Sequence, residues 1–482
     1  MSVQQVTTTS TLPKDAAIAA LAARLRGPVL RRGEESYAAV RPVYNAMIDK
    51  YPDLIARCVD VADVISAVTF ARAHRLTVAI RGGGHNGGGL GTCDGGLVID
   101  LSLMKGTHVD PVARTARVAG GCTWGDVDHA THAFGLATPS GIISTTGVGG
   151  LTLGGGLGHL TRACGLSIDN LLAVDVVLAD GQVVTASPER HQDLFWAVRG
   201  GGGNFGVVTS FLFKVHPIST VVGGPMLWHM DQAAEVLRWY RDFIPQAPDD
   251  LNGFFAFLKV PPGPPFPKAL HTKTMCAIVW CYTGPQDKAD AVYAPILRVA
   301  GGPAFGLVGP LPHPALQSMF DALYPPGFQW YWRADFVNEI SDEAIALHVK
   351  HGTELPTLFS TMHLYPINGV ASRVGKEDTA FSYRDATWGQ VIVGVDPDPA
   401  NAKRITDWTI AYWEALHPYS AGGAYVNMMM DEGVDRIKAS YRDNYERLVA
   451  IKNRYDPTNL FHVNQNIRPT VDRTLGGHLV EG

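Results

Sequence analysis

Between residues 54 and 80 the apolar positions change from the spacing of a strand to that of a helix and back. Residues 54–59 form a largely apolar run that predicts a strand. Over 61–71 the apolar residues recur every three or four positions, which predicts a helix, and Asp60 is placed to cap its N-terminus. The run 76–80 predicts a second strand, so this stretch indicates a β-α-β unit.

The same alternation extends to residue 209. Further strands are predicted at 96–100, 115–119 and 171–178, and further helices at 15–27 and 123–132. A hairpin over 174–184 is expected to turn at Asp180-Gly181, because an Asp-Gly pair readily adopts the backbone of a two-residue hairpin turn. Residues 36–48, with two tyrosines before Asn45, are assigned only as an irregular or helical lead-in.

Beyond residue 217 the pattern describes a second domain. Strand-like runs alternate with helical ones, and this part also holds most of the tryptophans. The predicted strands are 253–260, 275–282 and 390–395, and the predicted helices are 233–243, 342–351 and 402–415. Residues 221–420 are therefore predicted to form an α+β domain with its own core, in which a few aromatic side chains wall a pocket.

Three glycine-dense blocks interrupt the first part of the chain. Residues 81–86 read RGGGHN after a predicted strand, 140–158 mix glycine with Ser and Thr, and 200–203 are four consecutive glycines. Backbone N–H groups in such turns can form an anion-binding nest, to which Arg81 adds positive charge and His85 an imidazole. The first block alone could equally be a surface loop. One extended cofactor explains all three better, although no GxxxxGK[ST] motif or dinucleotide fingerprint occurs.

The bulk composition narrows the classes of partner. With 46% hydrophobic and 18% charged residues, the 482-residue chain is typical of a soluble globular protein of two or three domains. A net charge of -5 gives no reason to expect nucleic acid or a membrane as a partner, and no apolar run is long enough to span a bilayer. Residues 1–14 lack a signal core, so a cytoplasmic location is expected. The six cysteines lack metal-binding spacing, and no metal is expected.

Four blocks stand in order along the chain: RGGGHN at 81–86, the glycine block at 147–158, DLFWAVRGGGGNFGVVT at 193–209 and DPTNLFHVNQNI at 456–467. Together they resemble the FAD-linked oxidases of the berberine bridge enzyme-like group, within the vanillyl-alcohol oxidase or PCMH-type flavoproteins. The resemblance implies an α+β fold with a two-part PCMH-type FAD-binding domain made from 1–220 and 421–482. A substrate-binding domain, an antiparallel sheet flanked by helices, would be inserted at 221–420.

The resemblance also implies a covalently bound FAD. In this family the histidine of the pyrophosphate turn is bonded to the flavin 8α-methyl group, and His85 matches that position. A neutral imidazole suits this role because its ring nitrogen is a good nucleophile. Many members add a second link from a cysteine, where this chain has Ile143. A single link through His85 is therefore predicted, resembling the 6-hydroxynicotine oxidase type.

The same resemblance assigns further residues to FAD. They are Arg81, Gly82, Gly83, Gly84 and Asn86 in the first block, Ser140, Gly141, Thr145, Thr146, Gly149, Gly150, Gly154 and Gly156 in the second, Gly206, Val207 and Val208 in the third, and Asn427, Asn464 and Gln465 near the C-terminus.

A second departure from the family concerns the catalytic base. Many relatives carry a Tyr-x-Asn-Tyr segment whose second tyrosine deprotonates the substrate, and this chain has Met428 at that position. A thioether is not a useful proton acceptor, so the role is lost or has moved. The remaining candidates for the base are Tyr425, His363, Tyr365 and Tyr331.

The resemblance thus predicts an FAD-dependent oxidase for a small organic substrate. A C–H next to an alcohol or amine would deliver hydride to flavin N5, and O2 would reoxidise the flavin. Thr146 lies where the family's oxygen gate is expected, and its hydroxyl leaves open a dehydrogenase that uses another acceptor. A flavin-binding protein without turnover is an alternative, and a non-covalent NADPH reductase is a weaker one because it would not need His85. A monomer or homodimer is expected.

Overall fold

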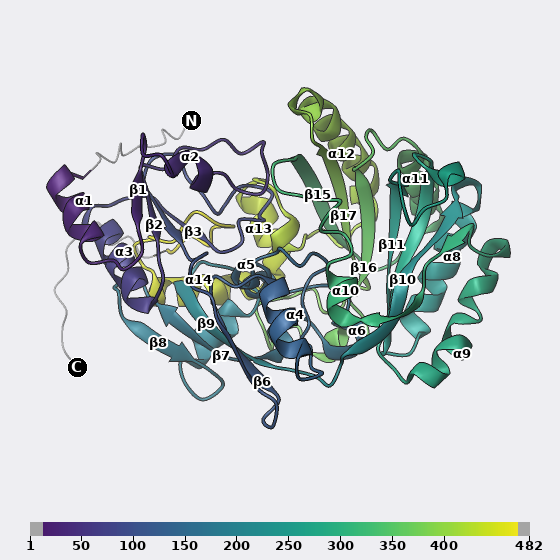
Figure 1. Ribbon diagram of the computed structural model, residues 1–482, viewed down its shortest axis with the longest axis horizontal. Coiled ribbons are helices and arrows are strands. Elements are labelled where there is room, and N and C mark those ends of the chain that lie inside the picture. The colour runs from purple at the N-terminus through teal and green to yellow at the C-terminus, as the bar shows by residue number, and fades with distance from the viewer. Residues whose placement is uncertain (1–12, 471–482) are drawn as a thin grey trace.

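The β-α-β unit predicted at 54–80 lies in a four-stranded sheet near the N-terminus (Figure 1). The computed structural model describes residues 13–470. The sheet has the order β1-β2-β4-β3 and consists of β1 (Val29–Arg31), β2 (Leu54–Arg57), β4 (Leu97–Asp100) and β3 (Val78–Arg81). Strand β4 lies between β2 and β3 and runs parallel to both. Helix α3 (Val61–Ala73) joins β2 to β3, and the Asp60 carboxylate accepts hydrogen bonds from the N–H groups of Ala62 and Asp63, which confirms the predicted cap.

A five-stranded antiparallel sheet packs against this first sheet. Its order is β5-β6-β9-β7-β8, from β5 (Thr107–Asp110), β6 (Thr115–Ala119), β7 (Leu171–Val177), β8 (Val183–Ala186) and β9 (Val207–Lys214). The predicted hairpin is confirmed, because β7 and β8 pair antiparallel on either side of Asp180-Gly181. Val177 and Val207 of this sheet share a hydrophobic core with Leu54 and Leu97 of the first.

A third sheet, entirely antiparallel, is built by the middle of the chain. Its order is β13-β10-β12-β11-β16-β17-β15, with β14 pairing β10. The strands are β10 (Thr220–His229), β11 (Leu251–Lys259), β12 (Thr274–Tyr282), β13 (Phe305–Gly306), β14 (Gly309–Pro312), β15 (Gln329–Val337), β16 (Thr361–Pro366) and β17 (Trp388–Asp396). Helices α8 (Ala233–Phe243), α11 (Asp342–Thr353) and α12 (Ala402–Leu416) lie along its outer side (Figure 1). The predicted α+β class is confirmed.

The two faces of the third sheet belong to different cores. Phe255 and Phe257 of β11 pack under the outer helices, in a cluster with Tyr240 of α8. Phe254 and Ala256 alternate with them and join the core that continues into the first part of the chain. Because successive side chains of a strand point to opposite faces, one sheet both completes its own domain and presents a wall to the other.

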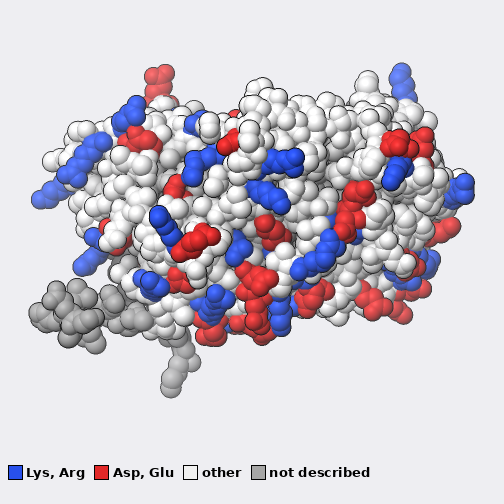
Figure 2. Space-filling view, turned by 90° about the horizontal axis from the view of Figure 1, so that it is seen from below, with Lys and Arg blue, Asp and Glu red and all other residues white. Residues whose placement is uncertain are grey.

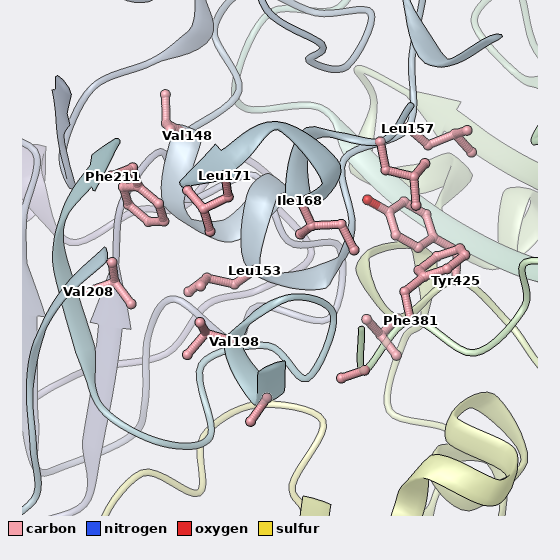
Figure 3. Close-up of a cluster of buried hydrophobic side chains, with 14 of the residues drawn as sticks. Val148, Leu153, Leu157, Ile168, Leu171, Val198, Val208, Phe211, Phe381 and Tyr425 are labelled. Carbon is pink, nitrogen blue, oxygen red and sulfur yellow. The ribbon is translucent and has the colours of Figure 1, made fainter. Parts of the chain in front are cut away.

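The pattern of the sequence did not predict every element. Strand β10 contains Gly223, Gly224 and Pro225, residue types that are rare in strands. Helix α5 (Val148–Gly154) lies within the second glycine block, and glycine costs about 1 kcal/mol per residue in a helix relative to alanine. Packing compensates for this cost. Val148 and Leu153 of α5 are buried, and they lie in the cluster of apolar side chains that includes Leu171, Val208 and Phe211 (Figure 3).

The remaining helices connect or cover these sheets. They are α1 (Asp15–Ala22), which ends before the predicted residue 27, α2 (Tyr37–Val40), α4 (Trp124–His132), α6 (Thr161–Cys164), α7 (Gln192–Val198), α9 (Ala289–Tyr293), α10 (His313–Gln317), α13 (Val434–Tyr441) and α14 (Tyr445–Tyr455). None of the helices within residues 13–470 is long and apolar enough to cross a bilayer. On the face of the molecule shown in Figure 2, acidic and basic side chains are interspersed.

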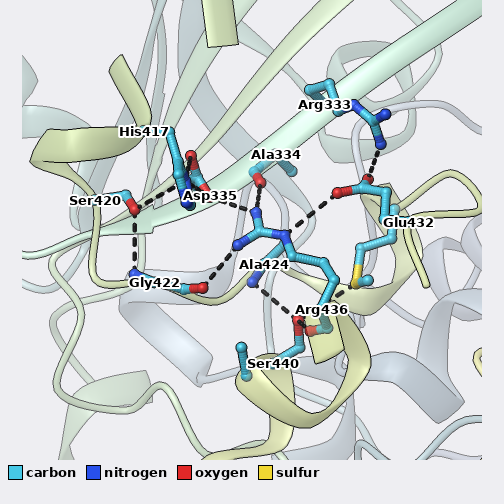
Figure 4. A network of polar contacts seen from close by, with 12 residues as sticks. Arg333, Ala334, Asp335, His417, Ser420, Gly422, Ala424, Glu432, Arg436 and Ser440 are labelled. Carbon is cyan, nitrogen blue, oxygen red and sulfur yellow. Dashed lines mark hydrogen bonds and ion pairs between the residues drawn. The ribbon is translucent and has the colours of Figure 1, made fainter. Parts of the chain in front are cut away.

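The C-terminal segment returns from the third sheet to the first part of the chain, and an ionic network fixes its path (Figure 4). Arg436 of α13 donates hydrogen bonds to the carbonyl oxygens of Ala334 (2.6 Å) and Gly422 (2.7 Å) and pairs with Asp335. Arg333 of β15 lies 2.9 Å from the carboxylate of Glu432. Helix α14 then packs on α7, the helix that precedes the third glycine block.

Candidate active site

A cavity of about 360 Å³ lies where the glycine blocks, the third sheet and the C-terminal turn meet. The predicted site residues that line it are Arg81, Gly82, Gly83, Gly84, His85, Asn86, Gly141, Thr146, Gly149, Gly150, Gly206, Val208, His363, Tyr365, Tyr425, Asn427, Asn464 and Gln465. Residues that are more than 300 positions apart in the sequence thus form one site.

Arg81 ends β3 at the edge of the cavity, but its charge is not free. Its guanidinium donates to Asp100 at 2.9 Å, and both side chains are buried. Burial raises the pKa of Asp100, but the charge and hydrogen bond of Arg81, together with hydrogen bonds from Ser102, outweigh this effect and hold that pKa below its usual range. Arg57 also pairs with Asp100 at 3.3 Å, so the two guanidiniums share one carboxylate, and Arg81 orients the turn through its own pair.

The first two glycine blocks touch through their backbones. A Cβ atom added to Gly83 would lie 2.4 Å from the nitrogen of Gly147, and one added to Gly147 would lie 2.3 Å from the nitrogen of Gly83. Only glycine allows so close an approach at both positions. This contact brings His85 of the first block beside Thr145 and Thr146 of the second.

His85 is held on one ring face and at both ring nitrogens. Its imidazole stacks on Tyr44 with ring centroids 3.9 Å apart and an interplanar angle of 20°. Nε2 lies 3.0 Å from the hydroxyl oxygen of Thr145, and Nδ1 lies 3.5 Å from that of Thr146. Burial lowers the pKa of His85 to about 4, so the imidazole is neutral near pH 7 and keeps a lone pair on one nitrogen.

The third sheet contributes an aromatic wall with one polar pair. Trp330, Trp332, Tyr365 and His363 line the cavity from β15 and β16. Nδ1 of His363 lies 2.6 Å from the hydroxyl of Tyr365. Burial lowers the pKa of His363 to about 3 and raises that of Tyr365, so both side chains are neutral at physiological pH. Nε2 of His363 has no hydrogen-bond partner among the described residues.

Tyr331 does not line the cavity, and its inclusion among the candidate bases is corrected. Strand alternation places Trp330 and Trp332 on the cavity face of β15 and Tyr331 on the opposite face. There its ring lies 5.3 Å from the guanidinium of Arg333, and its carbonyl oxygen accepts a hydrogen bond from Thr409 of α12.

The Tyr425 hydroxyl lines the cavity but is engaged in holding the second glycine block. It accepts hydrogen bonds from the backbone N–H of Gly156 at 2.8 Å and from Nδ2 of Asn427 at 2.7 Å. Burial raises the pKa of Tyr425 to about 12, and these hydrogen bonds offset part of the shift. Both oxygen lone pairs are thus in use, which leaves Tyr425 poorly suited to accept a substrate proton. Figure 3 shows its ring packed beside Phe381.

Five residues predicted to bind the cofactor are not among the residues that line the cavity. Ser140 is buried, and Val207 points to the opposite face of β9 from Val208, into another core. Gly154 and Gly156 make room for neighbouring side chains, because an added Cβ would lie 2.2 Å from Asn427 and 2.0 Å from Ser167. The fifth, Thr145, is exposed, and its hydroxyl oxygen lies 3.0 Å from Nε2 of His85.

Several lining residues were not predicted, above all Tyr44. It falls in the segment that was assigned only as a lead-in, and the one signal there was the pair of tyrosines before Asn45. Asn45 explains how this segment is held. Its Nδ2 donates to the carbonyl oxygens of Gly87 (2.8 Å) and Trp330 (2.9 Å), and its Oδ1 accepts from the N–H of Trp330 (3.0 Å). It thereby joins the first glycine block to the third sheet.

The chain is similar to flavoproteins over nearly its whole length. The family model described as FAD binding domain matches residues 52–187, and the model described as berberine and berberine like matches residues 424–468. An FAD-linked oxidoreductase of Dictyostelium discoideum is 32% identical over 92% of this chain and 95% of its own. The (R)-6-hydroxynicotine oxidase of Paenarthrobacter nicotinovorans is 38% identical over 205 residues, which are 42% of this chain and 45% of that protein.

A solved structure shares the fold. The 6-hydroxy-D-nicotine oxidase from Arthrobacter nicotinovorans superposes with a TM-score of 0.82 at 24% sequence identity, over 92% of this chain and 98% of that one. The likeness confirms the predicted PCMH-type architecture with its antiparallel substrate-domain sheet.

Proposed function

Because this chain belongs to the FAD-linked oxidoreductases of the berberine bridge enzyme-like family, we propose that it is an oxidase for a small organic substrate. It removes hydride from a C–H next to an alcohol or amine, and O2 is the final acceptor. FAD is its cofactor. When bound, FAD supplies the ring nitrogen N5 that accepts the hydride. The observation that supports the proposal best is that all three glycine blocks, His85 and His363 line one cavity.

The cavity residues fit an extended polar cofactor. Gly150 and Gly203 line the cavity, and no heavy atom lies within 4 Å of a Cβ added to either, so their backbones are open to a ligand. Asn464 lies on the C-terminal wall, and its buried Oδ1 has no hydrogen-bond partner among the described residues. An unpaired buried acceptor costs about 1–3 kcal/mol, so a ligand donor at this point would stabilise the protein.

The proposal includes covalent attachment of FAD through His85 alone. His85 lines the cavity and is neutral near pH 7, as a nucleophile must be. Ile143, at the position of the family's second linking residue, also lines the cavity and has no nucleophilic atom. Each of the six cysteines is buried, and none is among the lining residues.

We propose that His363 is the base when the substrate is an alcohol. An alcohol must lose its O–H proton as the hydride leaves, whereas a neutral amine needs no base. The described lining of the cavity contains no Asp, Glu or Lys, so His363 is its best-placed proton acceptor. If Nδ1–H donates to Tyr365, the lone pair of Nε2 is free to accept the substrate proton.

The test is the rate of flavin reduction, measured without oxygen by stopped flow. The substrate is the alcohol that bleaches the wild-type flavin fastest in a broad panel. His363→Gln should slow reduction by about 100-fold or more, the usual contribution of a general base. His351→Gln is the matched control, because His351 lies on α11 outside the cavity and should leave the rate unchanged. A wild-type rate in His363→Gln would exclude His363 as the base.

The proposed partners are the small substrate and O2, with the protein acting as a cytoplasmic monomer or homodimer. Thr146 lines the cavity beside His85, where the family's oxygen gate is expected. Mixing the reduced enzyme with air distinguishes an oxidase, which reoxidises rapidly with formation of hydrogen peroxide, from a dehydrogenase that uses another acceptor.

A further inference from the structure

The side chain of Tyr44 forms a rigid platform for His85. Its ring stacks on the imidazole, and the residue is fixed by one backbone contact and two side-chain contacts. The Tyr44 N–H donates to the carbonyl oxygen of Gly84 at 3.1 Å, its hydroxyl donates to the carbonyl oxygen of Tyr324, and Trp330 packs with its ring centroid 5.2 Å away. Only 6% of Tyr44 is exposed. Because the Tyr44 ring is held in place, the imidazole that stacks on it is held parallel to that ring.

The two nitrogens of His85 lie in different surroundings. Thr146, which is next to Nδ1, lines the cavity, whereas Thr145, which is next to Nε2, does not. The Nδ1 edge of the ring therefore lies beside the lining of the cavity, and the Nε2 edge lies beside Thr145, which is exposed. The contact to Thr145 is also the shorter one, 3.0 Å against 3.5 Å.

The surroundings of Nε2 indicate which nitrogen carries the proton. The Thr145 hydroxyl oxygen lies 3.0 Å from Nε2, where it can accept a hydrogen bond from a ring N–H. A neutral imidazole has one N–H and one lone pair. Attack on a cofactor in the cavity needs the lone pair on Nδ1, so the N–H is at Nε2 and donates to the Thr145 hydroxyl.

We propose that Tyr44 and Thr145 are positioning residues for the covalent attachment of FAD, which hold His85 as the Nε2–H tautomer with Nδ1 as the attacking atom. This inference rests on the proposed link through His85. Neither residue touches the reacting atoms: Tyr44 fixes the plane of the ring, and Thr145 fixes the tautomer.

The bond that forms joins Nδ1 to the 8α carbon of the flavin. One C–H bond of the 8α-methyl group breaks, and the imidazole loses its proton from Nε2, toward Thr145. The flavin ring gains the two electrons and two protons and is reduced. O2 then accepts both electrons and both protons and leaves as hydrogen peroxide, which restores the oxidised flavin. Without O2 the linked flavin would remain reduced.

The inference is tested on the full-length holoprotein. Wild type and variants are purified after a short induction, incubated in air with excess FAD and sampled over time. Two quantities are measured in each sample: total bound flavin, and the fraction that stays with the protein after acid precipitation. Their ratio reports the linkage alone, because a variant that merely folds or binds poorly loses total flavin. Thr145→Val and Thr145→Ser differ in the hydroxyl, and Tyr44→Leu and Tyr44→Phe differ in the ring.

Wild type, Thr145→Ser and Tyr44→Phe should reach a ratio near one at similar rates. In Thr145→Val the link should form at least about tenfold more slowly while total flavin stays normal, because one hydrogen bond affects a rate by about this much. In Tyr44→Leu the link should also form more slowly. If both variants form the link as fast as wild type, the positioning roles are wrong although the link through His85 stands. If wild type binds FAD but releases all of it in acid, the proposed link and this inference fall together.

Discussion

Replacing Lys452 with methionine removes one half of a fully buried ion pair. Lys452 and Asp456, one helical turn apart at the end of α14, are both 0% exposed, and Nζ lies 2.7 Å from the carboxylate. Nζ also donates to the carbonyl oxygens of Asn204 (2.7 Å) and Phe461 (2.9 Å). All three ammonium donors are thus used, and they tie the third glycine block to the C-terminal turn.

The expected cost follows from what remains after the substitution. Methionine fills a similar volume, so no large cavity forms, but the Asp456 carboxylate keeps only the backbone N–H groups of Leu460 and Phe461 and the hydroxyl of Thr458. Removing one partner of a buried pair costs about 3–5 kcal/mol because the other charge is left uncompensated. Because this pair fixes two walls of the cavity, the variant should also bind less FAD.

The exposed pair Lys403–Asp407 provides a matched control. It has the same spacing, but 84% of the lysine side chain and 60% of the aspartate side chain are exposed. Lys403→Met should cost about 0.5 kcal/mol or less. Urea denaturation of both variants and of wild type, compared at equal flavin content, measures the difference. If Lys452→Met loses no more stability than Lys403→Met, the assignment of this pair as the anchor of the C-terminal turn is refuted.

Two further predictions concern the contact between the glycine blocks and the buried histidines. Gly83→Ala should push the first two glycine blocks apart and lower the flavin content per protein measured by absorbance, whereas Gly309→Ala, with no atom within 4 Å of the added Cβ, should not. The urea midpoint of the apoprotein should fall from pH 6.5 toward pH 4. Burial lowers the pKa of His85 to about 4 and those of His159 and His363 to about 3. As the pH falls from 6.5, only the unfolded chain therefore takes up protons at these histidines. Each histidine then lowers the free energy of unfolding by up to about 1.4 kcal/mol per pH unit. Asp128 has the opposite effect, because burial raises its pKa to about 8 and the folded protein binds one more proton there than the unfolded chain does. A midpoint that is constant from pH 6.5 to pH 4.5 would contradict the account.

Elements with strong local signals could be predicted from the sequence. The predicted helix 233–243 matches α8 at both ends, and the Asp60 cap and the Asp180-Gly181 turn occur as expected. These features depend on residues close together in the chain. Helix α5 could not be predicted, because its glycines disfavour a helix locally and only its burial among distant strands stabilises it.

The sequence predicts which segments form the candidate site, but not how their side chains are arranged in it. The blocks that line the cavity were identified by their glycines, whose backbones must approach closely. The neighbour of each side chain depends on tertiary packing. The sequence cannot show that Asp100 pairs with Arg81, that Tyr331 points away from the cavity, or that Tyr44 stacks on His85. Tyr425 illustrates the same limit, since its partners Gly156 and Asn427 leave its hydroxyl no free lone pair.

The central claim is that this cavity holds an FAD that oxidises a small substrate and passes the electrons to O2. The most direct measurement is the absorbance of the purified enzyme mixed without oxygen with a panel of alcohols, amines and sugars, and then with air. The account predicts that at least one alcohol or amine bleaches the flavin, and that air restores the colour with one hydrogen peroxide formed per substrate oxidised. A flavin that dithionite reduces but that no member of the panel bleaches would contradict it.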